Sequence, residues 1–260
     1  MAKKISLISW NVNGIRAAER KGFLDFIATG KYDIVAVQET KVHDHVQLSQ
    51  ALLHPAGYNS YWHCCGPKKG YSGVGVYTKI VPHKVVTDFG NTLLSAEGRV
   101  LELHFADFIF LNIYFPNGGA SVERLKYKLQ FYKEFLTYLK KLKKLGKPIV
   151  FTGDINTAHE AIDLARPKQN ENTSGFMRVE RDWLDIFVAE GFVDSFRRLH
   201  PDKVQYSWWD QKTAARERNV GWRIDYFYVS TDLVDNIKKA EILGEVYGSD
   251  HAPVLLELEF

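Results

Sequence analysis

The chain has 260 residues, of which 45% are hydrophobic and 25% are charged, and its formal net charge is +3. This composition is ordinary for a globular protein and requires only a single domain over residues 1–260, while the weak positive charge excludes the acidic repulsion that would oppose nucleic-acid binding. Cys64 and Cys65 are adjacent and cannot close a useful disulfide loop, so we expect a reducing compartment. Because we find no signal peptide and no run of transmembrane length, we expect a cytoplasmic monomer without a membrane partner.

Two strands with polar ends are predicted first. Residues 5–10 form an apolar run that predicts a buried strand, and the amides Asn11 and Asn13 follow it. Residues 32–37 predict a second buried strand that stops just before Glu39. Glu39 is either a solvated turn residue or a ligand presented by a rigid strand. The helix expected between the strands shares one face made of Phe23, Phe26 and Ile27.

A basic loop and a series of short strands come next. Residues 45–53 predict a short helix, and residues 66–73 form a glycine-rich loop that contains Lys68, Lys69 and Tyr71. Such a loop can approach a phosphate backbone, because glycines expose N–H groups and lysines add charge, although a flexible hairpin connection has the same composition. Strands separated by turns then predict an antiparallel meander at residues 73–77, 81–86, 99–105 and 108–115.

A long helix is predicted to begin after Ser121, a good N-cap residue, and to end before Gly146. Its core stripe consists of Leu125, Leu129, Tyr132, Leu136 and Leu139. Its lysines form either a DNA-binding face or, as we favour, a solvated face. They are Lys126, Lys128, Lys133, Lys140, Lys141, Lys143 and Lys144.

Residues 148–159 read PIVFTGDINTAH and combine a buried strand with an acid and an amide. The apolar residues 149–151 predict a strand that closes at a turn containing Gly153. If the chain stays extended, Asp154 and Asn156 share one face, where a carboxylate can hold a hard cation and an amide can donate to a phosphate. Alternatively, the two side chains only stabilise their own turn.

The C-terminal part contains one more helix and two strands. The helix is predicted at residues 181–190, after an irregular polar segment, and the strands at residues 222–229 and 254–260.

Several predicted strands end in small polar clusters. They contain Asn11 and Asn13, Glu39, Tyr114 and Asn117, Asp154 and Asn156, Asp225, and Asp250 with His251. Because functional groups gather where strand ends meet loops, we expect one site at one rim of a sheet. Its oxygen ligands favour Mg²⁺ or Mn²⁺ over a structural zinc. Without a serine or cysteine nucleophile beside a base, water is the expected attacking group and phosphoester hydrolysis the expected reaction.

Seven ordered motifs carry a family resemblance over nearly the whole chain. They are WNVNG at 10–14, QETK at 38–41, GYSGV at 70–74, YFPNG at 114–118, GDINTAH at 153–159, NVGWRIDY at 219–226 and GSDHAP at 248–253. This pattern resembles the exonuclease III type of abasic-site endonucleases, within the wider endonuclease/exonuclease/phosphatase superfamily.

The resemblance implies an α+β fold, a four-layered αββα sandwich of two mixed, mainly antiparallel sheets flanked by helices. It also implies a Mg²⁺ site, with Mn²⁺ as a substitute, in which Glu39 is the main ligand and Asn11 and Asp250 assist. The implied activity is incision of duplex DNA 5′ to abasic sites to leave a 3′-hydroxyl, with 3′–5′ exonuclease and 3′ end-cleaning activity on damaged ends.

The resemblance further implies a role for each catalytic residue. Asp154 orients or deprotonates the attacking water, and His251, held by Asp225, stabilises charge on a non-bridging oxygen. Asn156 and Tyr114 contact the scissile phosphate.

The expected DNA contacts come from aromatic and polar residues. Trp208 and Trp222 resemble the walls of a pocket for a flipped, base-free sugar. The other expected contacts are Asn117, Tyr71, Lys68 and Lys69.

Two other functions stay open on the sequence. One is a superfamily enzyme that acts on inositol phosphates, sphingolipid or undamaged DNA, and the tryptophan pair argues against it. The other is a catalytically silent DNA-binding module, and the intact set of site residues argues against it.

Overall fold

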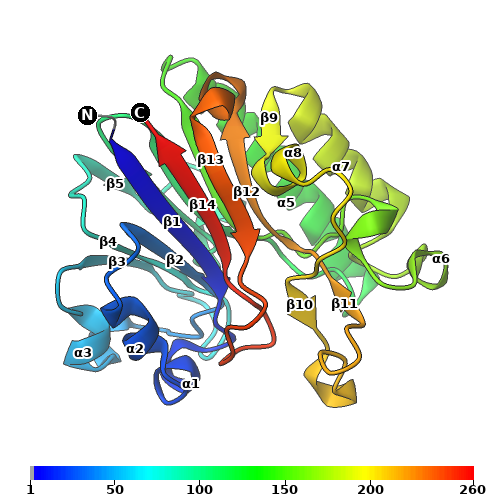
Figure 1. Cartoon of the computed structure of the whole chain (residues 1–260), viewed down its shortest axis with the longest axis horizontal. Helices are drawn as coiled ribbons and strands as arrows, with labels where there is room; N and C mark the ends of the chain where they lie inside the picture. The colour runs from blue at the N-terminus through cyan, green and yellow to red at the C-terminus, as the bar shows by residue number, and fades with distance from the viewer. Residues whose placement is uncertain (1–2) are drawn as a thin grey trace.

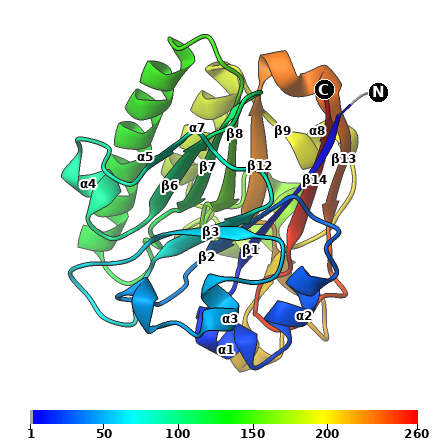
Figure 2. The same cartoon turned by 90° about the vertical axis from the view of Figure 1, so that its left-hand side faces the viewer.

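The computed structural model describes residues 3–260, which form four layers (Figures 1 and 2). Two six-stranded sheets face each other, and helices cover both outer faces. The predicted α+β class and αββα layering are therefore confirmed. Across residues 3–260, every helix is too short or too polar to cross a membrane.

Both sheets mix parallel and antiparallel neighbours. The first has the order β13 (Ile237–Ile242), β14 (Val254–Glu259), β1 (Lys4–Asn11), β2 (Ile34–Gln38), β4 (Val74–Thr78) and β3 (Asn59–His63). The second has the order β5 (Lys84–Val86), β6 (Val100–His104), β7 (Ile109–Tyr114), β8 (Ile149–Asp154), β12 (Asp225–Ser230) and β9 (Phe192–Asp194). The strands β1 and β2 run parallel, as do β7 and β8, and the other described pairs of these sheets are antiparallel.

Helices cover each sheet on the side away from its partner. The first sheet carries α1 (Ile15–Glu19), α2 (Phe23–Ala28) and α3 (Gln50–Leu53), and the second carries α5 (Val122–Lys143) and α7 (Arg178–Ala189). Shorter helices are α4 (Thr92–Ser95), α6 (Pro167–Asn170) and α8 (Ser195–Leu199). A ribbon of β10 (Trp208–Trp209) and β11 (Gly221–Trp222) projects beyond the sheets (Figure 1).

The apolar runs in the sequence are explained by this layering. On β1, Leu7 packs between the two sheets, whereas its neighbour Ile8 packs under the helices. Successive side chains of a strand point to opposite faces, and both faces of this sheet are covered. A strand buried on both sides can be apolar at successive positions, which is why continuous runs rather than alternating ones predicted the central strands.

Some predicted groupings are wrong. The four strands expected to form one meander are divided, because β4 belongs to the first sheet and β5, β6 and β7 to the second. The helix expected at residues 45–53 consists of a 3-10 turn, His45–Gln47, and α3, whose N-cap is Ser49. The strand expected at residues 222–229 is interrupted between β11 and β12. Strands β3, β9 and β13 and helices α4, α6 and α8 were not predicted.

Helix α5 begins and ends as predicted, but one of the lysines expected on its solvated face is buried. The Ser121 hydroxyl accepts a hydrogen bond from Arg124 N at 3.2 Å, as expected of an N-cap. Lys128 was expected on a solvated face, yet it is fully buried. It stands four residues before Tyr132 and seven before Phe135, both core residues, so it shares their face of the helix.

Strand direction brings the polar strand ends together. The parallel strands β1 and β2 end at Asn11 and Gln38, and the parallel strands β7 and β8 end at Tyr114 and Asp154. The antiparallel strand β12 begins at Asp225, which lies in register with Asp154. One edge of the sandwich therefore collects ends of parallel strands and the start of an antiparallel one.

We predict that Gly153→Ala destabilises the protein by about 2 kcal/mol or more. Gly153 has φ 143°, and a Cβ atom added there would lie 1.8 Å from the backbone oxygen of Ile113 on β7. Urea unfolding measures the effect. Gly66→Ala is the matched control, because its added Cβ would meet no atom within 4 Å. Equal midpoints for the two variants would contradict the prediction.

Candidate active site

A cavity of about 350 Å³ opens at the rim where the strand ends meet. Nine of the predicted site residues line it: Glu39, Tyr114, Asn117, Asp154, Asn156, Trp208, Trp222, Asp250 and His251. Asn11 and Asp225 lie behind this wall, fully or almost fully buried and hydrogen-bonded to its members. The loop residues Tyr71, Lys68 and Lys69 lie outside the cavity. The acids and the tryptophans thus share one cavity.

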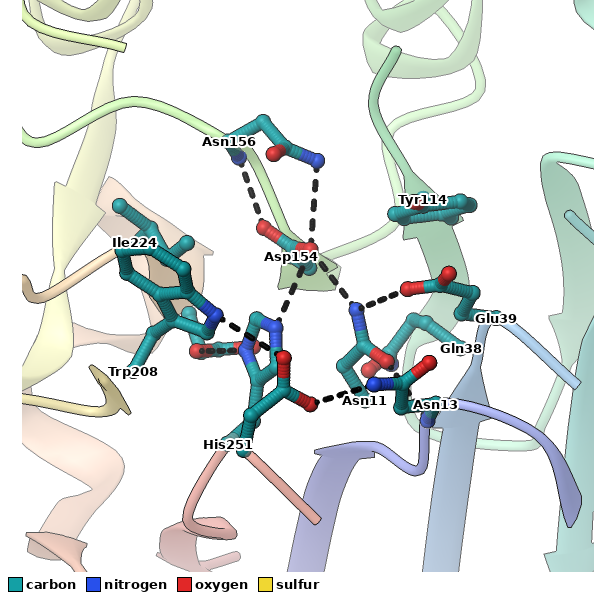
Figure 3. A network of polar contacts seen from close by, with 12 residues as sticks. Asn11, Asn13, Gln38, Glu39, Tyr114, Asp154, Asn156, Trp208, Ile224 and His251 are labelled. Carbon is teal, nitrogen blue, oxygen red and sulfur yellow. Dashed lines mark hydrogen bonds and ion pairs between the residues drawn. The ribbon is translucent and has the colours of Figure 1, made fainter. Parts of the chain in front are cut away.

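Asp154 is the centre of the hydrogen-bond network (Figure 3). Its Oδ2 accepts from Asn11 Nδ2 at 2.8 Å and from Asn156 Nδ2 at 3.2 Å. Burial raises the pKa of Asp154 to about 7, and the positive charge of His251, 3.9 Å away, acts in the opposite direction. A carboxyl group with a pKa near 7 is suited to accept a proton at neutral pH.

The backbone around Asp154 differs from the extended path we considered. Strand β8 continues through Gly153 to Asp154, so the predicted turn at Gly153 is wrong. Asn156 has φ 55°, a left-handed conformation that asparagine tolerates, and its N–H donates to Asp154 Oδ1 at 2.8 Å. The two side chains form an Asx-type turn and also face the same cavity, so both alternatives left open by the sequence describe part of the geometry.

His251 and Asp225 form a buried pair. The distance between His251 Nδ1 and Asp225 Oδ2 is 2.9 Å. Burial lowers the pKa of His251, but the charge and hydrogen bond of Asp225 outweigh it and raise the pKa to about 10. The imidazole is therefore protonated at neutral pH, with Nε2 facing Asp154.

Amide side chains organise the acids at the other end of the cavity. Asn11 Nδ2 donates to Glu39 Oε2 at 3.2 Å, and Asn13 Nδ2 donates to Asp250 Oδ1 at 2.9 Å. Lys41 Nζ lies 3.2 Å from Glu39 Oε1. The pKa of Asp250 is lowered although burial opposes it, because the charge of His251 and the hydrogen bonds from Asn13 and Trp208 favour the carboxylate.

These residues fit a divalent metal ion. Glu39 and Asp250 line the same cavity and supply carboxylate oxygens, the donors that hard cations prefer. Asn11 is also expected as a ligand. Its side-chain nitrogen faces Glu39 and Asp154, and its side-chain oxygen accepts one hydrogen bond, from Asn13 N at 3.0 Å. A second grouping of possible ligands, Asp154, Asp225 and His251, has ligand atoms within 4.8 Å of one another, although Asp225 is already hydrogen-bonded to His251.

The two tryptophans meet because β10 and β11 pair. Trp208 and Trp222 are register partners, with ring centroids 6.4 Å apart at 77°. Trp208 Nε1 donates to Asp250 Oδ2 at 3.2 Å, which joins this apolar wall to the acidic end. Phe176 packs edge-on against Trp222, and Ile224 completes the wall.

The Tyr71 loop is joined to the site through a residue that the sequence did not single out. Arg99, almost fully buried, donates to the Tyr71 hydroxyl at 2.9 Å and to the Tyr114 backbone oxygen at 3.0 Å. Its guanidinium lies over the Tyr114 ring, 4.8 Å from the centroid. Lys68 Nζ lies 4.5 Å from the Tyr71 ring centroid, and Lys69 lines a small separate pocket.

Sequence reasoning missed the residues that support the site. Arg99 lies between Gly98 and the start of β6, and nothing in this local sequence marks it as buried. Ser207 precedes Trp208 and gives no local signal, yet its buried hydroxyl donates to Asp225 Oδ2 at 2.6 Å. Only the packing of β12 against the β10 segment reveals it.

Known proteins with similar sequences and structures include nucleases and a DNA 3′ phosphatase. The model of the Endonuclease/Exonuclease/phosphatase family matches residues 8–251. The chain is 44% identical over 254 residues to an exodeoxyribonuclease of Bacillus subtilis, covering 97% of this chain and 98% of that protein. It is 38% identical over 256 residues to a DNA-(apurinic or apyrimidinic site) endonuclease of Dictyostelium discoideum, and the match covers 96% of this chain and 70% of that protein. The solved structure of the 3′ phosphatase NExo from Neisseria, bound to a product DNA hairpin, superposes on this chain with a TM-score of 0.89. The two sequences are 26% identical, and the match covers 98% of this chain and 100% of that one.

We predict that Ser207→Ala lowers the free energy of unfolding by about 1–3 kcal/mol, the cost of leaving buried donors unpaired. The Ser207 hydroxyl accepts from the backbone N–H groups of Ile224 at 3.1 Å and Asp225 at 3.2 Å. Urea unfolding gives the change, with exposed Lys212→Ala as control. A midpoint equal to that of the control would show that Ser207 does not support Asp225.

Proposed function

Because the chain belongs to the Endonuclease/Exonuclease/phosphatase family, we propose that it is a metal-dependent DNA-repair phosphodiesterase. Its substrate is duplex DNA with an abasic site or a damaged 3′ end. It incises on the 5′ side of the abasic site, leaves a 3′-hydroxyl, and also has 3′–5′ exonuclease and 3′ end-cleaning activity. One observation carries the proposal: the proton acceptor Asp154 and the apolar pair Trp208 and Trp222 line the same cavity.

Asp154 is the group that activates water. Asn11 and Asn156 hold its two oxygens, which fixes the direction in which the carboxylate can accept a proton. Water gives up a proton to Asp154 and bonds to phosphorus, and the bond between phosphorus and the 3′ oxygen of the preceding nucleotide breaks. The leaving 3′ oxygen takes a proton from solvent and becomes the 3′-hydroxyl. The 5′-phosphate then stays with the abasic sugar.

Three side chains bind the scissile phosphate. Protonated His251 donates from Nε2 to a non-bridging oxygen and stabilises the negative charge that develops there. Asn156 lies beside Asp154 and is held by Asn117 Nδ2, which donates to Asn156 Oδ1 at 3.0 Å. Tyr114, whose hydroxyl pKa is raised by burial, stays a neutral phenol and a donor.

Glu39 and Asp250, assisted by Asn11, would hold the metal, and Asn11 also donates a hydrogen bond to the Glu39 carboxylate. A bound Mg²⁺, or Mn²⁺ in its place, would supply positive charge that offsets the negative charge of the phosphate. The acids keep their position through Asn11 and Asn13 rather than through contact with each other.

The aromatic wall selects the substrate. A base-free sugar flipped out of the duplex gains apolar contact with Trp208 and Trp222, whereas a nucleotide with its base is too large. Tyr71, Lys68 and Lys69 contact the duplex beside the site. We take residues 1–260 to act as one domain and as a monomer. The free cysteines Cys64 and Cys65 support a reducing compartment such as the cytoplasm.

We predict that the protein nicks a labelled duplex with a single abasic analogue in the presence of Mg²⁺ and that EDTA abolishes the nick. Asp154→Ala should lower kcat by about 10²–10⁴-fold, the usual contribution of a general base. Gel analysis of the labelled strand measures both effects. The control variant is Asp202→Ala, which removes an exposed acid. Full nicking in EDTA or by Asp154→Ala would refute the mechanism.

We predict that Trp222→Ala lowers the ratio of kcat/KM for an abasic duplex to kcat/KM for an intact duplex by about 10-fold or more. The substitution removes one wall of the pocket but leaves Asp154 and His251 in place. Comparing the two duplexes with one enzyme preparation cancels any difference in the folded fraction. An unchanged ratio would show that this wall does not select the abasic sugar.

A further inference from the structure

The fully buried Lys128 of α5 and Glu180 of α7 form an ion pair that has no part in the proposed chemistry. The distance between Lys128 Nζ and Glu180 Oε1 is 2.6 Å. Lys128 Nζ also donates to the Asn156 backbone oxygen and to Thr157 Oγ1, both at 2.7 Å. The three acceptors saturate the three N–H bonds of the ammonium group.

Glu180 holds a second segment. Its Oε1 accepts from Ser174 Oγ at 3.0 Å, and its Oε2 accepts from Gly175 N at 2.7 Å and Met177 N at 3.3 Å. Ser174 and Gly175 line the cavity, and a Cβ atom at Gly175 would lie 3.3 Å from the ring of Trp222. The carboxylate therefore fixes a wall of the cavity that packs closely against the tryptophan.

The pair joins two parts of the cavity that come from different regions of the chain. On one side is Asn156, whose left-handed backbone needs support from its surroundings. On the other is the wall at Ser174 and Gly175. A direct link supports the same arrangement, because Ala158 N donates to the Gly175 backbone oxygen at 2.8 Å. The ion pair thus fixes Asn156, the proposed phosphate contact, relative to the cavity wall at Ser174 and Gly175.

We propose that Lys128 and Glu180 are positioning residues, which act on the reaction through Asn156 and the cavity wall without touching the substrate. This inference rests on the proposed function for its kinetic consequence, but not for its structural one. A buried ion pair gives little net stability compared with apolar side chains of similar size. Its value here lies in directional hydrogen bonds, which apolar packing cannot supply.

The test variant is Lys128→Met with Glu180→Gln, which leaves no unpaired charge in the core. Its structural effect is measured by hydrogen exchange of the free protein. We expect faster exchange at residues 156–158 and 174–177 and unchanged exchange in β1, β7 and β8. Unchanged exchange in the two segments, or an equal increase throughout the protein, would overturn the proposal whether or not the protein cleaves DNA.

The kinetic effect is measured with the abasic duplex in a double-mutant cycle. We expect the paired variant to lower kcat by about 10-fold or more, with a smaller change in KM. In an Asn156→Ala background, the same pair of substitutions should lower kcat by a smaller factor than in the wild type, because the part of the effect that acts through the Asn156 side chain is already lost. If the pair of substitutions lowers kcat by the same factor in both backgrounds, the pair does not act through Asn156.

The matched control is Lys126→Met, which removes an exposed lysine two positions away on the same helix. It should match the wild type in exchange and in kcat. If it lowers kcat as much as the paired variant does, the effect belongs to the charge of the helix and not to the buried pair. A wild-type protein that does not nick the duplex refutes the proposed function, and the exchange result alone then decides the positioning role.

Discussion

The relative placement of the two sheets is the constraint on which the site depends, and a buried amide fixes it. Asn112 of β7 donates from Nδ2 to the backbone oxygens of Val37 at 3.0 Å and Gly75 at 2.8 Å, both in the opposite sheet. Its Oδ1 accepts from Gln38 Nε2 at 2.7 Å. Sliding one sheet over the other would leave these groups unpaired at a cost of about 1–3 kcal/mol each. Gln38 directly precedes Glu39, so the link lies beside the acids it serves.

The site is divided between the sheets, and its main hydrogen bonds cross from one to the other. Asn11, at the end of β1, reaches Asp154, at the end of β8. His251, just before β14, reaches Asp225, at the start of β12. The apolar side chains packed between the sheets keep the two sheets, and so both pairs of hydrogen-bonded residues, at a fixed separation. Neither sheet alone contains Asp154 together with Asn11 and His251, so the proposed chemistry depends on the packed sandwich.

The aromatic part of the proposed site is built differently, from segments outside the two sheets. The β10 and β11 ribbon supplies the tryptophans, and the segment held by Glu180 supplies the facing wall. These segments are attached to the sandwich by polar contacts, such as the hydrogen bond from Trp208 to Asp250. A fold of this kind can keep its phosphodiester chemistry while the surrounding segments set which substrate enters.

The sequence by itself determined which residues could do chemistry and where the main strands and the long helix lie. Runs such as residues 149–151 are local signals, as is the Ser121 cap, because strand and helix periods act over a few neighbours. The tertiary structure alone decided that β4 leaves the expected meander, that Lys128 is buried, and that Arg99 and Ser207 support the site. These features depend on partners far along the chain, such as Glu180, which is 52 positions from Lys128. No local period encodes such a pairing, since it exists only after the layers have packed.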